Sequence, residues 1–181
     1  MQNEHIWALL LIAIVSVMIL GNRKVRLFSL IKEQLCVFTN DKTKRRSMWD
    51  YICFLLLPIL AALILVCRLE FTIDANLANL LTTVFSVVFT VLFGFAAIMI
   101  SKIESQNKIE RQVAEETFVS IVSSTILSLV AAVASIVLTQ VETALYIQIL
   151  SAFIIALSLV IVMLILMITK RTFLLYVDNR K

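Results

Sequence analysis

The chain has 181 residues, of which 61% are hydrophobic and 15% are charged, and its mean hydropathy is +1.02. This composition excludes an ordinary soluble domain and is typical of an all-α integral membrane protein. The single histidine and the three cysteines have no metal-ligand spacing, and no phosphate-binding loop or nucleophile–base motif is present. We therefore expect no enzyme, no metal and no cofactor, and we predict a bundle of about five transmembrane helices.

Residues 1–21 form the first predicted segment, in which Ile6 to Leu20 is an apolar run of 15 residues. Extending this run from His5 to Gly21 gives 17 residues, the lower limit for a transmembrane helix. Glu4 precedes the run and basic residues follow it, which is the opposite of a cleaved secretory signal. We interpret the segment as an uncleaved span with its N-terminus outside, and an interfacial or re-entrant helix is the alternative.

Residues 22–50 form a basic amphipathic segment that we place at the cytoplasmic surface. Apolar residues recur at helical spacing from Leu27 to Phe38, which predicts an amphipathic helix lying on the inner leaflet. A basic loop follows from Thr39 to Ser47. Such a surface can bind anionic membrane lipids or a soluble partner, and a topology signal without a partner is the alternative. The candidate partner-binding residues in this segment are Arg26, Lys32, Lys42, Lys44, Arg45 and Arg46.

Residues 51–181 are predicted to form a four-helix transmembrane domain. Its first helix is Tyr51–Cys67, and Tyr51 marks the inner interface as aromatic belt residues do. Pro58 lies in the middle of this helix and removes a backbone donor, which predicts a kink. A tight external turn at 68–74 connects it to the next helix.

That next helix is predicted to be unusually long. The 24 residues from Leu77 to Ile100 contain no charge and no proline, and they extend about 36 Å as a helix. No Gly or Pro interrupts the polar stretch at 101–117, so we predict one continuous helix from Ala75 to Glu116. Its polar part then forms a helical extension in the cytoplasm. A membrane helix followed by a polar loop is the alternative.

Two rows of small residues have a spacing of four, which puts each row on one face of its helix. Small residues allow close contact between membrane helices. The row on the fourth span, Phe118–Leu138, can pack against the row on the third span or against another copy of itself, and a hydroxyl-lined pore is a further alternative. The third span carries Thr82, Ser86, Thr90 and Gly94, and the fourth carries Ser120, Ser124, Ser128 and Ala132.

The fifth predicted span is Ala144–Ile168. The distribution of charged residues then predicts on which side of the membrane each connecting segment lies. Fifteen of the 16 Lys and Arg residues lie on one side of the membrane if 22–50, 101–117 and the tail from Lys170 are cytoplasmic, and Arg68 is the exception. The C-terminus is therefore expected in the cytoplasm. A second cytoplasmic group can dock a soluble protein or be a solvated helix end, and it comprises Lys108, Glu110, Arg111, Glu115 and Glu116.

No Asp, Glu, Lys or Arg lies inside any predicted span. Pumps, proton-coupled carriers and voltage sensors depend on such residues, so these classes are disfavoured. The basic loop has no interleaved aromatic residues that could stack on bases, so we expect no direct binding of nucleic acid. What remains is a scaffold, a sensor or a simple pore.

Three stretches of the chain are similar to stretches of a known family. They are Trp49–Pro58 (WDYICFLLLP), Asn79–Phe95 (NLLTTVFSVVFTVLFGF) and Glu115–Val130 (EETFVSIVSSTILSLV). Together with the order of the spans, they resemble the KwaA family, the membrane subunits of the Kiwa anti-phage defence system. The resemblance covers most of the chain from Trp49 onward. The family has four transmembrane helices, so Ile6–Leu20 would be an additional segment.

The resemblance implies a homo-oligomer, a tetramer, in the bacterial inner membrane that senses phage attachment or membrane disturbance. It also implies a cytosolic DNA-binding partner, KwaB, that restrains phage replication and late transcription. Our first hypothesis is accordingly a membrane scaffold and sensor that recruits a cytosolic effector. The alternative is a homo-oligomeric pore or holin-like effector that depolarises the membrane, and a superinfection-exclusion protein is a third option.

Overall fold

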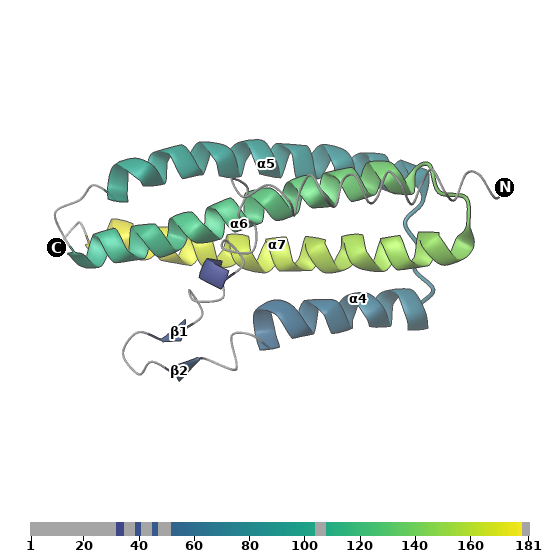
Figure 1. The fold of residues 1–181 in the computed structure, drawn as a ribbon, viewed down its shortest axis with the longest axis horizontal. Coiled ribbons are helices and arrows are strands. Elements are labelled where there is room, and N and C mark those ends of the chain that lie inside the picture. The colour runs from purple at the N-terminus through teal and green to yellow at the C-terminus, as the bar shows by residue number, and fades with distance from the viewer. Residues whose placement is uncertain (1–31, 35–38, 41–44, 47–51, 104–107, 179–181) are drawn as a thin grey trace.

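Figure 1 shows a computed structural model, which describes residues 32–34, 39–40, 45–46, 52–103 and 108–178. Within these residues the fold is helical, as expected, apart from two strands of two residues that pair antiparallel. The predicted first segment and most of residues 22–50 lie outside the described part. The labelled elements are β1 Thr39–Asn40, β2 Arg45–Arg46, the π-helical turn η1 Ile52–Leu56, α4 Leu57–Arg68, α5 Ala75–Ile103, α6 Lys108–Leu138 and α7 Ala144–Asp178.

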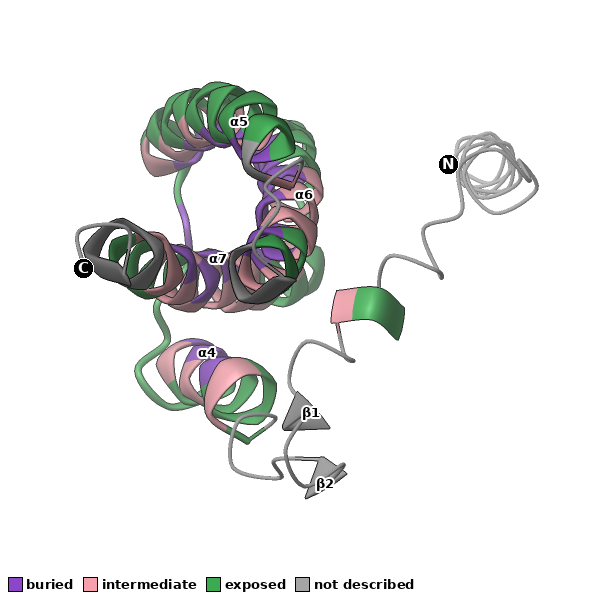
Figure 2. Ribbon diagram, turned by 90° about the vertical axis from the view of Figure 1, so that its left-hand side faces the viewer, coloured by how far each residue is buried: buried purple, intermediate pink, exposed green. Residues whose placement is uncertain are grey.

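The three longest helices lie side by side with α6 in the middle, and α4 lies against α7 (Figure 1). The order across the bundle is therefore α5, α6, α7 and α4, so α4 is separated from the helix that follows it in the chain. Figure 2 looks along the bundle and shows that the buried residues of α5, α6 and α7 lie on the sides that face one another.

Three of these helices are long and apolar enough to cross a membrane, namely Ala75–Ser101, Arg111–Leu138 and Ala144–Phe173. The helical stretch Ile52–Arg68 is apolar but shorter, and it corresponds to the predicted span Tyr51–Cys67. The described residues thus support a helical membrane protein with three long spans. They do not establish the five-helix bundle that the sequence predicts.

A buried stripe on α6 holds the bundle together. Its residues alternate at intervals of three and four, and each is at most 4% exposed. This average spacing of 3.5 keeps one helix face against its neighbours in left-handed packing. Most of the residues are small, which allows the helix backbones to approach closely. The stripe comprises Ala114, Thr117, Ile121, Ser124, Ser128, Ala131, Ser135 and Leu138.

The helices on either side of α6 supply larger side chains to this stripe. On α5 the buried residues follow one another at intervals of seven, and on α7 they follow at intervals of three, seven, three and four. They form two apolar clusters, one around Phe85 and Ile154 and the other around Leu92 and Ile168. The share of the span that is buried is 44% in α6, against 17% in α5 and 22% in α7. The buried residues concerned are Ala78, Phe85, Leu92 and Met99 on α5 and Ser151, Ile154, Ile161, Leu164 and Ile168 on α7.

The prediction of one helix from Ala75 to Glu116 is wrong. α5 ends at Ile103, α6 begins at Lys108, and α6 runs back along α5 (Figure 1). The polar stretch contains no helix breaker, so its local sequence favours a continuous helix. A helix that continued to Glu116 would carry Ala114 away from the bundle, whereas reversal of the chain between α5 and α6 leaves Ala114 fully buried.

α7 also differs from its predicted boundary. It continues past Ile168 to Asp178, so Lys170 and Arg171 are helical residues and not part of an irregular tail. The segment after Arg171 contains no Gly or Pro that could end a helix.

Pro58 lies at the start of α4, directly after the π-helical turn η1. A proline ring inside a regular α-helix clashes with the carbonyl four residues earlier, which here belongs to Phe54. The wider π-helical turn ends just before Pro58 and relieves this conflict. The sequence predicts a local disturbance at this point, and the structure shows its form.

The connection between α4 and α5 is tied to both neighbouring helices. The side chain of Asp74 accepts a hydrogen bond from the amide of Leu77 (2.9 Å) and so caps the N-terminus of α5. The amide of the buried residue Ile73 donates to Oγ of Ser151 on α7 (3.1 Å). Glu70 adopts a positive φ of 51°, which is uncommon for a residue other than Gly and marks the sharp turn after α4. These contacts fix the bundle end that lies opposite the connection between α5 and α6.

The buried stripe generates a stability prediction. Ser124→Leu inserts a large side chain where the residue is fully buried, and we expect a loss of about 1–3 kcal/mol of unfolding free energy. The control is Ser101→Leu, because Ser101 is exposed on α5 and its hydroxyl also bonds its own helix. That variant should stay within about 0.5 kcal/mol of the original. Titration of the purified protein from mild detergent into SDS measures both, and equal stability of the two variants would contradict the packing described here.

Candidate functional site

The charged residues of the long helices are confined to the helix ends. No Asp, Glu, Lys or Arg occurs in 75–101, 117–138 or 144–169. Because α5 and α7 end beside the start of α6, many charges gather at one end of the bundle (Figure 1). We call this the charged end, and it comprises Lys102, Lys108, Glu110, Arg111, Glu115, Glu116, Lys170, Arg171 and Asp178.

An ion pair joins α6 to α7 at the charged end. Nη1 of Arg171 lies 3.0 Å from Oε2 of Glu116, in an orientation that does not make a hydrogen bond. The two side chains are only 20% and 31% exposed, respectively, so the pair is partly shielded from water. The other carboxylate oxygen of Glu116 accepts a hydrogen bond from the side chain of Gln112 (3.2 Å). Glu116 is therefore occupied inside the chain.

A second ion pair lies on the outer surface of α6. Nε of Arg111 donates to Oε1 of Glu115 at 2.8 Å, four residues along the same helix. Their side chains are 61% and 49% exposed, respectively, so both charges remain accessible to a partner. Exposed pairs of this spacing contribute only a few tenths of a kcal/mol to helix stability. Lys170 is also exposed. The charged end thus has one internal pair and an outward-facing set of charges.

The other predicted partner-binding residues are only partly accounted for. Lys108 and Glu110 lie in the first turn of α6, whereas the structure describes nothing of their side chains. Lys32 is exposed in a helical turn at 32–34. Arg45 and Arg46 form β2 and pair with β1. The remaining predicted residues of this basic segment, Arg26, Lys42 and Lys44, lie outside the described residues.

The two rows of small residues have different surroundings. On α5, Ser86, Thr90 and Gly94 are exposed and Thr82 is half-buried. A Cβ added at Gly94 would meet nothing within 4 Å. The three hydroxyl groups each donate to the backbone carbonyl four residues earlier on α5. The face of α5 that meets α6 is instead the face with Phe85 and Leu92. Of the two partners that the sequence left open for the α6 row, the α5 row of the same chain is therefore not the one that it meets.

The row on α6 is covered by the neighbouring helices. Ser120, Ser124 and Ser128 are fully buried and Ala132 is 8% exposed. The serine hydroxyls donate to carbonyls of α6 itself, at distances of 2.8–3.0 Å. In this fold the row therefore packs inside one chain. It presents no hydroxyl surface that could line a pore between copies.

Arg171 is the residue of this site that the sequence interpretation missed. The sequence assigns it to a tail, yet it lies two residues after the apolar stretch of α7, while Glu116 directly precedes that of α6. Opposite charges at matching edges of two antiparallel spans are the signal that could have identified the pair.

The described residues contain no group of three or more His, Cys, Asp or Glu side chains that could hold a metal ion. Comparison with known proteins gives no match to a family model, to a curated protein or to a solved structure.

The ion pair between α6 and α7 can be tested by exchanging its charges. Glu116→Arg and Arg171→Glu each place like charges together, and we expect each to lower the unfolding free energy by about 0.5–1 kcal/mol. The double exchange should recover most of this loss. SDS titration measures all three variants, with Glu115→Arg as the control on the exposed side of α6. Losses that simply add in the double variant would show that the pair does not couple the two helices.

Proposed function

We propose that the protein is a membrane-embedded scaffold that recruits a soluble protein at its charged end. The observation that supports this proposal most is the division of charges between the two ion pairs. Glu116 and Arg171 join α6 to α7 by an ion pair. Arg111 and Glu115 lie on the same part of α6 as Glu116, but their side chains face outward. A firmly held helix end with accessible charges of both signs suits the docking of a protein with complementary charges.

In this proposal the charged end faces the cytoplasm and the C-terminal end of α7 lies there too. Five of the Lys and Arg residues of the long helices lie at the charged end, whereas the opposite end has Arg68 with the acidic residues Glu70, Asp74 and Glu142. Basic residues concentrate on the cytoplasmic side of membrane proteins. The three long apolar helices support the membrane location itself.

The resemblance to the Kiwa membrane subunits leads to a more specific version of this proposal. The protein would then lie in the bacterial inner membrane, respond to membrane disturbance during phage attack, and recruit a KwaB-like DNA-binding effector. Sensing of the bilayer requires a helix whose fit to the membrane changes. α4 suits this role because it is short and packs mainly against α7.

We further propose that copies of the chain associate through α5, forming a homo-oligomer that the family resemblance makes a tetramer. The row on α6 is buried within the chain, whereas the row from Ser86 to Gly94 is open. Small residues on an exposed helix face allow close contact with another membrane helix.

Recruitment is tested by exchanging the outward pair, Arg111→Glu together with Glu115→Arg. This double variant keeps an ion pair on the helix but reverses the charge pattern that a partner meets. A tagged copy would be expressed with its neighbouring genes and purified in mild detergent. We expect the co-purified soluble protein to fall at least about tenfold, which corresponds to about 1.4 kcal/mol of binding energy.

The control for this experiment is Arg68→Glu, an exposed change at the opposite end of the bundle, which should leave recruitment unchanged. Undiminished co-purification with the exchanged pair would contradict docking at the charged end. A homo-oligomer that carries no soluble protein and conducts ions in liposomes would favour the depolarising pore.

Self-association is tested with Gly94→Leu. The chain itself has open space at this position, so the variant should fold with unchanged stability. If copies meet at this row, the added side chain should shift the particle mass in detergent toward the monomer. Val84→Leu is the control, because Val84 is exposed on the side of α5 away from the row of Ser86, Thr90 and Gly94. An unchanged mass for Gly94→Leu would place the contact between copies elsewhere.

A further inference from the structure

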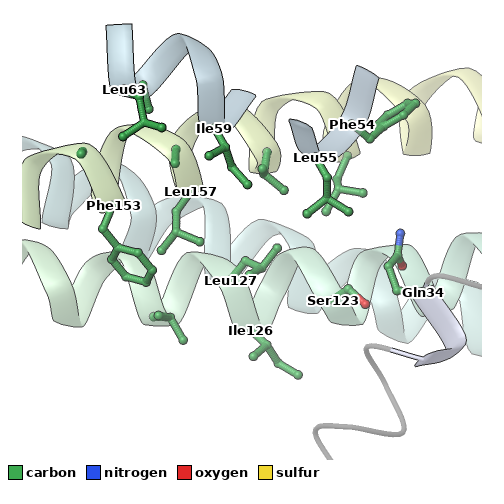
Figure 3. Close-up of a pocket in the computed structure, with 16 residues that line it drawn as sticks. Gln34, Phe54, Leu55, Ile59, Leu63, Ser123, Ile126, Leu127, Phe153 and Leu157 are labelled. Atoms are coloured by element: carbon green, nitrogen blue, oxygen red, sulfur yellow. The ribbon is translucent and has the colours of Figure 1, made fainter. Parts of the chain in front are cut away.

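An elongated cavity lies between α4 and α6, with α7 as its floor (Figure 3). It arises because α4 packs along α7 but not along α6, so two helix faces are left apart. Its volume is about 630 Å³, within the usual range of ligand pockets. The walls include Leu55 and Ile59 from the α4 side, Leu127 from α6, and Phe153 and Leu157 from α7.

The cavity is apolar except at one end. Of its sixteen lining residues only Gln34 and Ser123 have polar side chains, and Figure 3 shows these two near each other. Leu63 and Phe153 line the cavity at a distance from them in the same view. The polar end is the one nearer the charged end of the bundle, since Ser123 lies seven residues beyond Glu116 on α6.

The polar groups at this end have no partners. Oγ of Ser123 and both polar side-chain atoms of Gln34 are shielded from solvent and make no hydrogen bond. The neighbouring hydroxyls of Ser124 and Thr125, by contrast, donate to backbone carbonyls of their own helix. Buried polar groups in folded proteins are nearly always hydrogen-bonded, so the Ser123 hydroxyl and the Gln34 amide nitrogen beside the cavity are available to donate to a molecule that carries an acceptor.

We propose that this cavity binds one acyl chain of a membrane phospholipid, whose ester carbonyl accepts hydrogen bonds from Ser123 and Gln34. The cavity runs along the helices, as acyl chains do in a bilayer. Its polar end lies about 10 Å from Glu116 along α6, just inside a headgroup layer about 5–8 Å thick. An aqueous metabolite does not fit this lining, because almost all of the wall would leave its polar groups unpaired.

The bound acyl chain would fill the space beside α4 and so set the distance between α4 and α6. This site is independent of the proposed recruitment of a soluble protein, since none of its lining residues belongs to the charged end.

The experiment uses the full chain in liposomes that contain a phosphatidylethanolamine with a photoreactive diazirine on its acyl chain. After illumination, mass spectrometry of peptides locates and quantifies the label. We expect labelling of the cavity walls around Phe153 and Leu127. Ala156→Phe fills the cavity from α7 and should lower that labelling at least about fivefold, whereas Ala97→Phe on the exposed surface of α5 should leave it unchanged.

The polar end is tested separately, with changes that do not alter the packing. Ser123→Ala should lower labelling about fivefold, the loss expected for one neutral hydrogen bond, and Ser124→Ala is the matched neighbour that should have no effect. An ether-linked form of the same probe, which lacks the carbonyl, should label as weakly as the Ser123 variant. Equal labelling by ester and ether probes, or equal labelling of Ala156→Phe and Ala97→Phe, would overturn the proposal.

Discussion

The other features of the structure depend on one constraint, the close packing of α6 between α5 and α7, which contribute larger side chains. The α6 stripe of Ala, Ser and Thr side chains recurs at an average of 3.5 residues, so it stays against its neighbours over the full span. Within a membrane there is little hydrophobic driving force between helices, and contact at short range must supply the stability. The stripe therefore determines which helices are neighbours and where the chain must reverse.

The position of the charges follows from this packing. The antiparallel run of α5, α6 and α7 brings the start of one helix beside the ends of two others, so charges distant in sequence collect at one end (Figure 1). One pair is used to join helices and the other is left outward. The proposed recruitment role depends on this difference in exposure between Glu116 and Glu115, which adjoin in the sequence.

α4 has a different relation to the bundle. It is short, it begins with a π-helical turn before Pro58, and it packs against α7 without closing on α6. The cavity exists because this packing is incomplete, and its apolar walls and unpaired polar groups led us to propose a lipid as its ligand. The part of the fold that is least constrained by the α6 stripe is thus the part best placed to respond to the bilayer.

The sequence by itself determined the helical membrane class, the approximate limits of three spans and the confinement of charge to their ends, because hydropathy and helix length are local properties. It also marked Ser120, Ser124 and Ser128 as packing residues. It did not determine their partners: the α5 row, one of the two candidate partners, is exposed from Ser86 to Gly94, and the chain expected to continue as a helix to Glu116 reverses before α6. Only the tertiary structure decided these points, and it alone revealed the Glu116–Arg171 pair and the cavity. The physical reason is that complementary stripes lower the free energy only when helices far apart in sequence come together, and a local pattern does not specify which ones.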